Sequence, residues 1–298
     1  MKKYLPYLIM LLPPLFWAGN FIVGKAVSNQ HIPIGLSFWR WFLATLIFTP
    51  FVLKAIIKEK DIILKHFPKI VILSLLSISA FNSLAYISLQ YTTALNATIL
   101  NSFIPIFILI IVSLFFKEKI SRYQVVGIFI SLLGVFIILS RLDINIIKNI
   151  TFNKGDLWML VAALDWAMYS ILLKYLRPTE LKPMTFLGIM MILGTIFLIP
   201  LYLANPFNEL MITLNKDVIY ALAYIAIFPS IISYLAWNYG LQKIGVALGG
   251  QYIHLMPIFG ALMAVLFLGE KIELYHILGG IGIGLGLWLS MQKHKEAI

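Results

Sequence analysis

The chain has 298 residues, of which 61% are hydrophobic and 12% are charged, and its mean hydropathy is +0.95. A soluble domain does not need so much apolar surface, so the composition excludes that class and indicates a polytopic membrane protein. The net charge of +11 also occurs in nucleic-acid-binding proteins. Here, however, the basic residues fall in short loops between apolar runs, and we expect no nucleic-acid partner. The chain contains no cysteine, which excludes disulfides and thiolate metal sites, and we predict no metal or other cofactor.

Ten apolar segments are long enough to cross about 30 Å of hydrocarbon as helices. In chain order they are Tyr7–Val27, Ile34–Leu53, Pro68–Leu89, Thr93–Phe116, Tyr123–Leu139, Gly155–Leu176, Pro183–Leu203, Val218–Leu241, Gly245–Leu268 and Tyr275–Met291. The predicted fold class is therefore an all-α integral membrane protein with ten transmembrane helices.

The distribution of Lys and Arg predicts the orientation of these helices. With the N-terminus inside, the cytoplasmic loops and ends hold sixteen of the 23 basic residues and the outer loops hold six, while Arg40 lies within the second segment. This bias predicts that both termini are cytoplasmic. The exception is the connection that contains Arg141, Lys148 and Lys154, which places three basic residues on the outer side.

The two halves of the chain resemble each other. Pro105-Ile106-Phe107 is echoed 152 residues later by Pro257-Ile258-Phe259, and Glu118-Lys119-Ile120 by Glu270-Lys271-Ile272. Such an echo indicates an internal duplication. The predicted domains are a first five-helix repeat over 1–141, a connecting loop over 142–154 and a second five-helix repeat over 155–298. Because five is odd, the second copy enters the membrane inverted, an arrangement characteristic of secondary transporters.

Two ionisable residues lie near the centres of predicted spans. Asp165 in the sixth segment costs roughly 2.5–3.5 kcal/mol to insert if charged, so it should face a partner or a wet cavity. It either binds a substrate ammonium or carries a coupling proton, or it is a structural ion pair or neutral carboxyl. His254 in the ninth segment either takes part in proton coupling or is a hydrogen-bonded packing residue. Both residues are therefore candidates for substrate binding and for coupling.

Other polar and aromatic side chains lie at a depth suited to a central cavity, and we expect about half of them to line it. The remaining candidate substrate-binding residues are Trp17, Asn20, Asn82, Tyr86, Asn101, Trp166, Tyr169, Tyr234, Trp237 and Asn238. Arg40 either holds a carboxylate or ties helix ends together. Lys25 and Lys174, at helix ends, either snorkel to the interface or take part in gating.

The chain resembles the drug/metabolite transporter superfamily of the EamA type over nearly its whole length. The resemblance is carried by Trp17-Ala18-Gly19-Asn20-Phe21 with Lys25, by Arg40, by Gly155-Asp156-Leu157, by Trp166-Ala167 with Tyr169, by Tyr234 with Trp237 and by the two Glu-Lys pairs. It implies ten helices in two inverted bundles, cytoplasmic termini, a central cavity and movement of small organic metabolites, often outward. Asp165 departs from the family pattern, which has a small or weakly polar residue there.

These observations predict a secondary transporter in the bacterial cytoplasmic membrane. The favoured substrate is an amino acid or similar zwitterion, exported by alternating access, with the proton as a candidate coupling ion. The alternatives are an exporter of drugs or cationic amphiphiles and an intramembrane enzyme. No H-E-x-x-H or G-x-S-x-G motif occurs in the sequence, so we do not expect an enzyme.

Glycines in the tenth segment form two overlapping G-x-x-x-G patterns, Gly280 with Gly284 and Gly282 with Gly286. Such patterns let helices approach closely. They predict packing within the bundle or an oligomer that forms through this helix.

Overall fold

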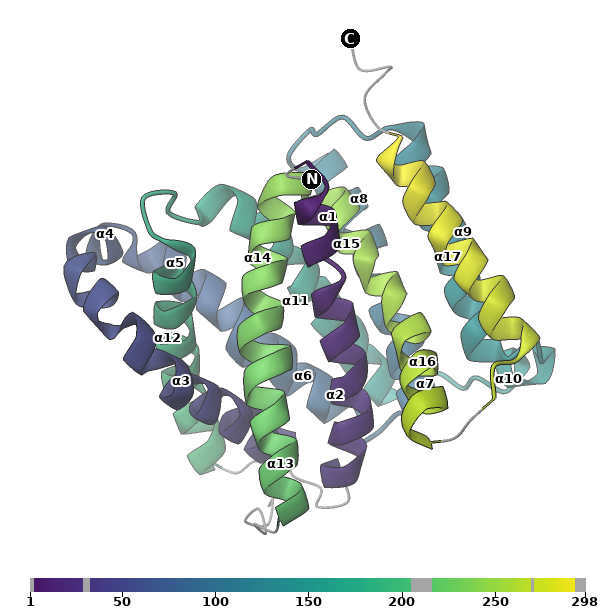
Figure 1. The fold of residues 1–298 in the computed structure, drawn as a ribbon, viewed down its shortest axis with the longest axis horizontal. Helices are drawn as coiled ribbons and strands as arrows, with labels where there is room; N and C mark the ends of the chain where they lie inside the picture. Colours follow the sequence, from purple (N-terminus) through teal and green to yellow (C-terminus); the bar gives the residue numbers. More distant parts are fainter. Residues whose placement is uncertain (1–2, 29–32, 205–215, 269–270, 293–298) are drawn as a thin grey trace.

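The computed structural model describes residues 3–28, 33–204, 216–268 and 271–292, and every regular element in these ranges is helical (Figure 1). The first half comprises α1 (Leu5–Ile9), α2 (Leu12–Ser28), α3 (Pro33–Lys58), α4 (Lys60–Lys65), α5 (Phe67–Ser74), the π-helix η1 (Leu75–Ala80), α6 (Phe81–Ser88), α7 (Ala94–Asn101), α8 (Ile104–Leu114) and α9 (Arg122–Ser140). After α10 (Ile144–Lys148), the second half comprises α11 (Lys154–Leu176), α12 (Pro183–Ala204), α13 (Lys216–Ile225), the π-helix η2 (Ala226–Ile232), α14 (Ser233–Ile244), α15 (Val246–Gln251), the 3-10 helix η3 (Tyr252–Leu255), α16 (Met256–Leu268) and α17 (Leu274–Met291).

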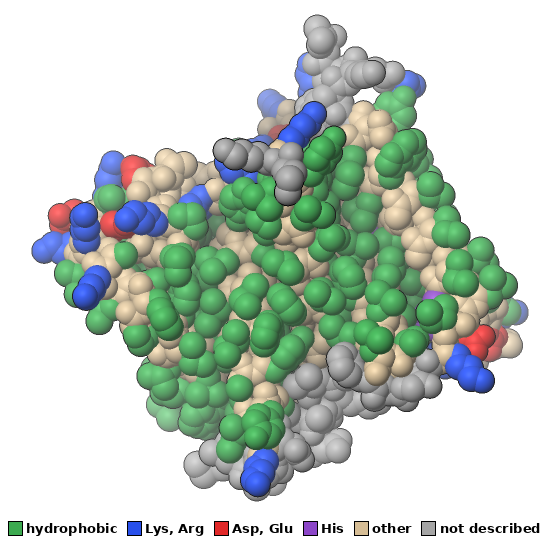
Figure 2. Space-filling model, in the orientation of Figure 1, with side chains coloured by type: hydrophobic (Ala, Val, Ile, Leu, Met, Phe, Trp, Pro, Cys, Tyr) green, Lys and Arg blue, Asp and Glu red, His purple; other side chains and the backbone are tan. Residues whose placement is uncertain are grey.

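These helices match the predicted spans. Nine segments of the described chain are long and apolar enough to cross a membrane. The remaining span consists of α1 and α2, which are separated just before Pro13 and Pro14, two residues without the backbone N–H that a continuous helix needs. Figure 2 shows hydrophobic side chains over the broad middle of one face and charged side chains gathered at its ends. The prediction of an all-α membrane protein is confirmed.

The last helices of the two halves, α9 and α17, pack against each other through glycines. A Cβ atom at Gly127 would clash with the carbonyl oxygen of Gly286, and one at Gly134 would lie 2.6 Å from that of Gly279. As the residue number rises along α9 it falls along α17, so the two helices run antiparallel, side by side in Figure 1. Gly127 and Gly279 are equivalent in the repeat, as are Gly134 and Gly286. The halves are therefore inverted relative to each other.

The same glycines bear on the expected oligomer contact. Gly286 packs against α9 within the chain, whereas a Cβ atom at Gly280 or Gly284 would meet nothing within 4 Å. The two G-x-x-x-G patterns therefore lie on different faces of α17, and Gly280 and Gly284 lie on the outer one.

Helix irregularities recur at equivalent depths in both halves. The π-helix η1 in the third span corresponds to η2 in the eighth. The break between α7 and α8, before Pro105, corresponds to η3, before Pro257. The prolines predict the second pair of breaks. They do not predict η1, which contains no proline, and irregular backbone at this depth requires partners within the protein or a wet cavity.

The halves are joined by charged contacts at the end that carries the start of α9 and the end of α17, here called the Glu118 end. Lys174 Nζ lies 2.7 Å from Glu118 Oε1, and the Tyr175 hydroxyl donates to the same oxygen at 2.5 Å. Glu180 adds an ion pair to Lys65 at 3.6 Å. Lys174 is thus paired across the halves, while the side chain of Lys25 and the whole of Glu270 lie outside the described residues.

We expect Glu118→Gln to loosen this end of the bundle. Ile171 is buried one turn before Lys174 on α11, and because the natural chain has no cysteine, Ile171→Cys gives a single thiol probe. A partly exposed ion pair contributes about 0.2–1 kcal/mol, so its loss should raise the rate of maleimide labelling by no more than about fivefold. Asp61→Asn, at an exposed position on α4, is the matched control and should leave the rate unchanged. Equal labelling of Glu118→Gln and its parent would show that the pair does not hold this end closed.

Candidate functional site

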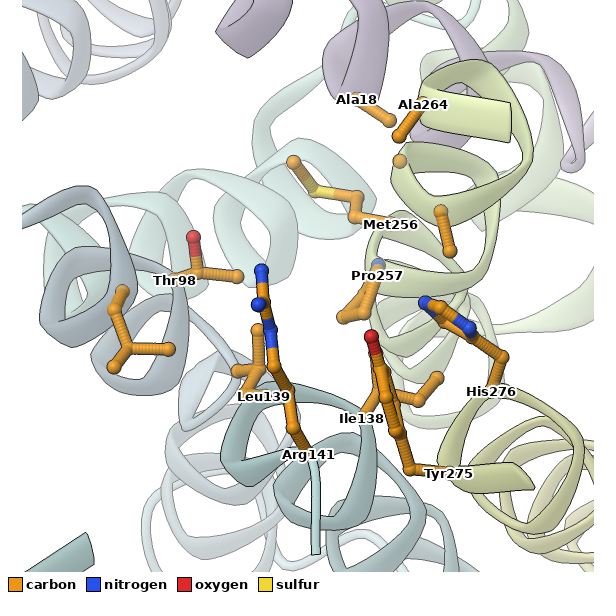
Figure 3. A pocket seen from close by; sticks show the side chains of 13 residues that line it. Ala18, Thr98, Ile138, Leu139, Arg141, Met256, Pro257, Ala264, Tyr275 and His276 are labelled. Carbon is orange, nitrogen blue, oxygen red and sulfur yellow. The ribbon is translucent and has the colours of Figure 1, made fainter. Parts of the chain in front are cut away.

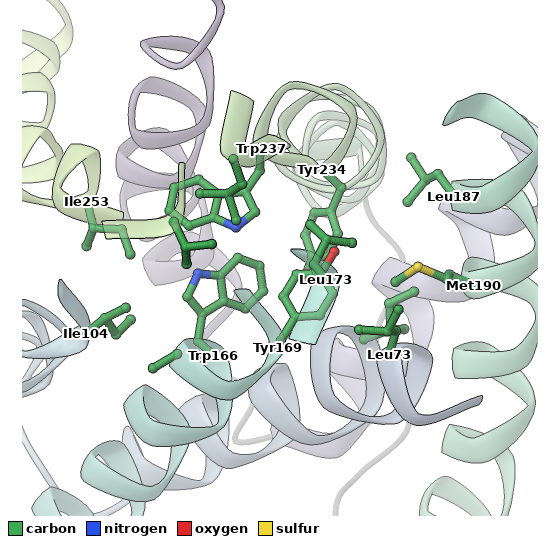
Figure 4. Close-up of a cluster of buried hydrophobic side chains, with 14 of the residues drawn as sticks. Leu73, Ile104, Trp166, Tyr169, Leu173, Leu187, Met190, Tyr234, Trp237 and Ile253 are labelled. Atoms are coloured by element: carbon green, nitrogen blue, oxygen red, sulfur yellow. The ribbon is translucent and has the colours of Figure 1, made fainter. Parts of the chain in front are cut away.

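A cluster of aromatic rings lies where the two halves meet. Trp17 of α2 packs against Trp166 of α11 and Trp237 of α14, with ring centroids 5.3 Å apart in both pairs. Tyr234, also on α14, lies 5.5 Å from Trp166. Figure 4 shows Trp166 and Tyr169 on α11 facing Tyr234 and Trp237 on α14, and all four side chains are buried. Trp17, Trp166, Trp237 and Tyr234 are called the aromatic cluster below.

The polar atoms of Trp17, Tyr234 and Tyr169 are hydrogen-bonded. The Trp17 indole N–H donates to the Pro229 carbonyl oxygen at 3.0 Å, in the π-helix η2. The Tyr234 hydroxyl donates to the Ser77 carbonyl oxygen at 2.7 Å, in the π-helix η1. The Tyr169 hydroxyl donates to Asn238 Oδ1 at 2.5 Å. Each π-helix thus supplies a carbonyl group to one member of the aromatic cluster, η2 to Trp17 and η1 to Tyr234.

Arg40 occupies the space between the π-helix η2 and α6. Its Nε donates to Ser230 Oγ at 2.7 Å and its Nη2 donates to the Pro229 carbonyl oxygen at 3.2 Å. Its Nη1 donates to Asn82 Oδ1 at 2.9 Å and to the Tyr86 hydroxyl at 3.2 Å. The guanidinium is buried and bonded on all three nitrogens. The geometry favours the tie between helices over the binding of a substrate carboxylate.

Asp165 has no such set of partners. Its side chain is half-buried on α11, next to Trp166, and its Oδ2 atom is buried without a hydrogen-bond partner among the described residues. Asn20, on α2, has a similarly buried and unpartnered Oδ1 atom. A carboxyl without a partner at this depth is costly, which distinguishes Asp165 from Arg40, whose guanidinium is bonded on all three nitrogens.

His254 lies elsewhere, in η3, and is fully buried. Its Nε2 is 2.9 Å from the Ser102 carbonyl oxygen, which can only accept, so Nε2 carries the hydrogen. Its Nδ1 is 2.5 Å from Ser131 Oγ, which also accepts a bond from Gln251 Nε2. No hydrogen bond or ion pair among the described residues joins His254 to Asp165. Both ring nitrogens are engaged, which favours the packing interpretation of this histidine.

The structure therefore divides the sequence-predicted residues into groups. Tyr169 and Asn238 join the aromatic cluster. Asn82 Nδ2 donates directly to the Tyr234 hydroxyl at 3.4 Å, and Tyr86 is bonded to Arg40. Asn101 lies apart, its Nδ2 3.9 Å from Met256 Sδ. Trp41, which the sequence analysis did not single out, packs its ring 4.8 Å from Tyr234. In the sequence, only the position of Trp41 directly after Arg40 could have indicated that it belongs to the site.

A cavity of about 330 Å³ lies next to the part of α2 that carries Trp17. It includes Arg141, at the end of α9, and is therefore at the opposite end of the bundle from Glu118. It is lined by Ala18, Leu95, Thr98, Ile138, Leu139, Arg141, Met256, Pro257, Gly260, Ala261, Ala264, Tyr275 and His276 (Figure 3). These residues come from both halves. None of the predicted substrate-binding residues is among them, although Ala18 directly follows Trp17. Arg141, whose place in the sequence breaks the charge bias, is the signal that could have indicated the cavity.

Comparison with known proteins assigns the chain to a family. The profile of the EamA-like transporter family matches residues 5–140 and 153–292. The chain belongs to the EamA-like transporter family. The two matched segments correspond to the two inverted halves, so each half is one EamA unit.

Similar proteins agree with the chain in length. An uncharacterized transporter of Archaeoglobus fulgidus is 29% identical over 293 residues, covering 97% of this chain and 98% of the relative. The uncharacterized transporter YyaM of Bacillus subtilis is 26% identical, covering 96% and 93%. A solved crystal structure superposes with a TM-score of 0.77 over 96% of this chain and 97% of that chain, at 14% identity, which shows a shared fold. The protein is therefore a multi-pass membrane transporter of EamA type.

Proposed function

We propose that the protein exports amino acids or similar zwitterions across the bacterial cytoplasmic membrane by alternating access. In this proposal both termini are cytoplasmic and the protein catalyses no covalent reaction. The Glu118 end, where ion pairs join the halves, faces the cytoplasm. The cavity at the other end faces outward.

The observation that carries this proposal is the unpartnered carboxyl of Asp165 beside the aromatic cluster. A carboxylate supplies the counter-charge for an ammonium group, and the faces of Trp and Tyr rings attract cations. The indole rings of Trp17 and Trp237 also offer apolar surface for a substrate side chain. A zwitterion with an apolar side chain matches these groups.

Asp165 also suits coupling to protons. A carboxyl that can hold either a proton or a substrate ammonium cannot hold both, so binding of one releases the other. This competition is the basis of proton–substrate exchange. His254 is the weaker coupling candidate, because Ser102 and Ser131 already bind its two nitrogens.

A lipophilic cation is the alternative substrate. One carboxyl among aromatic rings recognises such a cation as well as it recognises an amino acid. The two proposals differ in the need for a substrate carboxylate. An amino acid and its methyl ester should behave differently if the substrate is a zwitterion, and similarly if it is a cation.

Transport into inside-out membrane vesicles tests the proposal. Labelled L-leucine, L-phenylalanine and L-lysine, and a lipophilic cation such as tetraphenylphosphonium, are offered with an imposed proton gradient. We expect gradient-dependent uptake of at least one neutral amino acid, which its unlabelled form inhibits and its methyl ester does not. Uptake of the phosphonium alone would favour the alternative, and absence of flux for the whole panel would contradict both.

A further inference from the structure

The cavity at the Arg141 end has a composition that the proposed function does not explain. Most of its wall is apolar, from Leu95 and Leu139 of the first half and Met256, Pro257 and Ala261 of the second. Its volume of about 330 Å³ is at the lower end of the range for small-molecule sites. Asp165 and the aromatic cluster do not line it.

One exposed cation, Arg141, lines this apolar space. Arg141 follows the last residue of α9 and has a left-handed backbone, with φ 53°. Figure 3 shows its side chain extended between Thr98 and Pro257, with the guanidinium directed towards Met256. Within the described part of the chain no acidic side chain forms an ion pair with it. The Tyr275 hydroxyl also points into the cavity, towards Pro257.

We propose that this cavity binds a small amphipathic carboxylate, with its anionic head on Arg141 and its apolar body against Leu139, Met256 and Pro257. A guanidinium presents two parallel N–H groups to a carboxylate, which gives both strength and orientation. The Tyr275 hydroxyl is a further donor on the same side. The narrow apolar wall selects a short aliphatic or aromatic body.

The same assignment explains an anomaly in the sequence. Arg141 lies on the predicted outer side, where the charge bias disfavours arginine. Arg141 and Lys148 are both exposed, but only Arg141 lines the cavity. A requirement for a cation at the cavity wall would explain why an arginine occupies this position against the bias.

The inference rests on the proposed function for its biological meaning, because the site would receive the carboxylate end of a transported zwitterion at the outer end of its path. Binding itself does not depend on transport. Purified protein in detergent micelles can therefore be tested with hexanoate, L-norleucine, hexylamine and hexanol, which share a six-carbon chain and differ in head group.

We expect hexanoate and norleucine to bind and to raise the melting temperature, because a ligand that binds the folded state stabilises it. Hexylamine and hexanol should not bind. Arg141→Gln should weaken hexanoate binding by about tenfold or more, since a charge-assisted bond contributes roughly 1.5–3 kcal/mol. Lys148→Gln removes an equal charge from the same connection and should bind as the wild type does.

A second pair of variants tests the location without changing charge. A Cβ atom at Gly260 or at Gly284 would meet nothing within 4 Å, but only Gly260 lines the cavity. Gly260→Leu should fill the cavity and abolish hexanoate binding, whereas Gly284→Leu, on the outer face of α17, should leave it intact. This pair keeps the test decisive if Arg141→Gln folds poorly.

Three results would overturn the proposal. They are equal hexanoate affinity in Arg141→Gln and wild type, hexylamine binding as tightly as hexanoate, and displacement of hexanoate by phosphatidylglycerol, which would assign the cavity to a lipid head group. Failure of the proposed function has a different signature. In that case no amino acid is transported, while hexanoate binding and its dependence on Arg141 persist.

Discussion

Asp165→Asn is expected to lower the initial rate of amino-acid uptake into inside-out vesicles by about ten- to hundredfold. The factor follows from the loss of a charged partner for the substrate ammonium, which contributes roughly 1.5–3 kcal/mol. The melting temperature of the purified variant should be at least as high as that of the wild type. The reason is that Oδ2 of Asp165 has no hydrogen-bond partner for the substitution to remove.

Asp156 provides the control on the same helix. Its Oδ1 accepts a bond from the Thr92 hydroxyl at 2.5 Å, and its Oδ2 accepts one from the backbone N–H of Asn153 at 2.9 Å, which caps α11. Asp156→Asn should lower the melting temperature and leave the transport rate per folded molecule unchanged. If Asp165→Asn instead lost stability and kept its rate, the carboxyl would be structural and the proposed substrate contact would be wrong.

Gly127→Val is expected to destabilise the protein more than Glu118→Gln, Asp156→Asn or Arg141→Gln. The new side chain would clash with Ser290 Oγ and with the Gly286 carbonyl oxygen, so the backbones of α9 and α17 must separate. Overpacking in a core costs about 1–3 kcal/mol, and the cost is larger where the obstacle is backbone. The thermal denaturation of the purified protein should therefore shift down by several degrees.

Gly284→Val tests whether this effect depends on the contact. It places the same side chain in the same helix type, at a position where nothing lies within 4 Å, and should leave the melting temperature nearly unchanged. Equal losses in both variants would mean that the valine disfavours the helix itself, and that the approach of α9 to α17 contributes little.

The sequence predicts the span positions well because hydropathy and helix length are both local properties. It predicts the breaks before Pro105 and Pro257 for the same reason. It does not predict the π-helix η1, because nothing in Leu75–Ala80 marks an altered hydrogen-bond pattern. The equivalent π-helix η2 contains Pro229, and this proline is the only local sign of an altered hydrogen-bond pattern in either segment.

For the candidate residues, the sequence predicts the depth in the membrane better than it predicts the neighbouring side chains. Hydropathy places Asp165 and His254 near mid-span, but it does not fix the direction in which each helix face turns. The structure supplies this direction, and gives His254 two partners and Asp165 none for its Oδ2. The partners of Arg40 come from residues more than forty positions away, which no local pattern connects.

The hydrogen bond between His254 and Ser102 joins two positions that are one repeat length apart, so it crosses the pseudo-twofold axis that relates the halves. A dimer of two identical second halves would bring two imidazoles to that axis, where they would compete for the same volume. A dimer of two first halves would bring two Ser102 carbonyls there and no imidazole. In the single chain one half contributes the imidazole donor and the other the carbonyl acceptor, so the unlike residues at this position favour pairing of the two halves with each other.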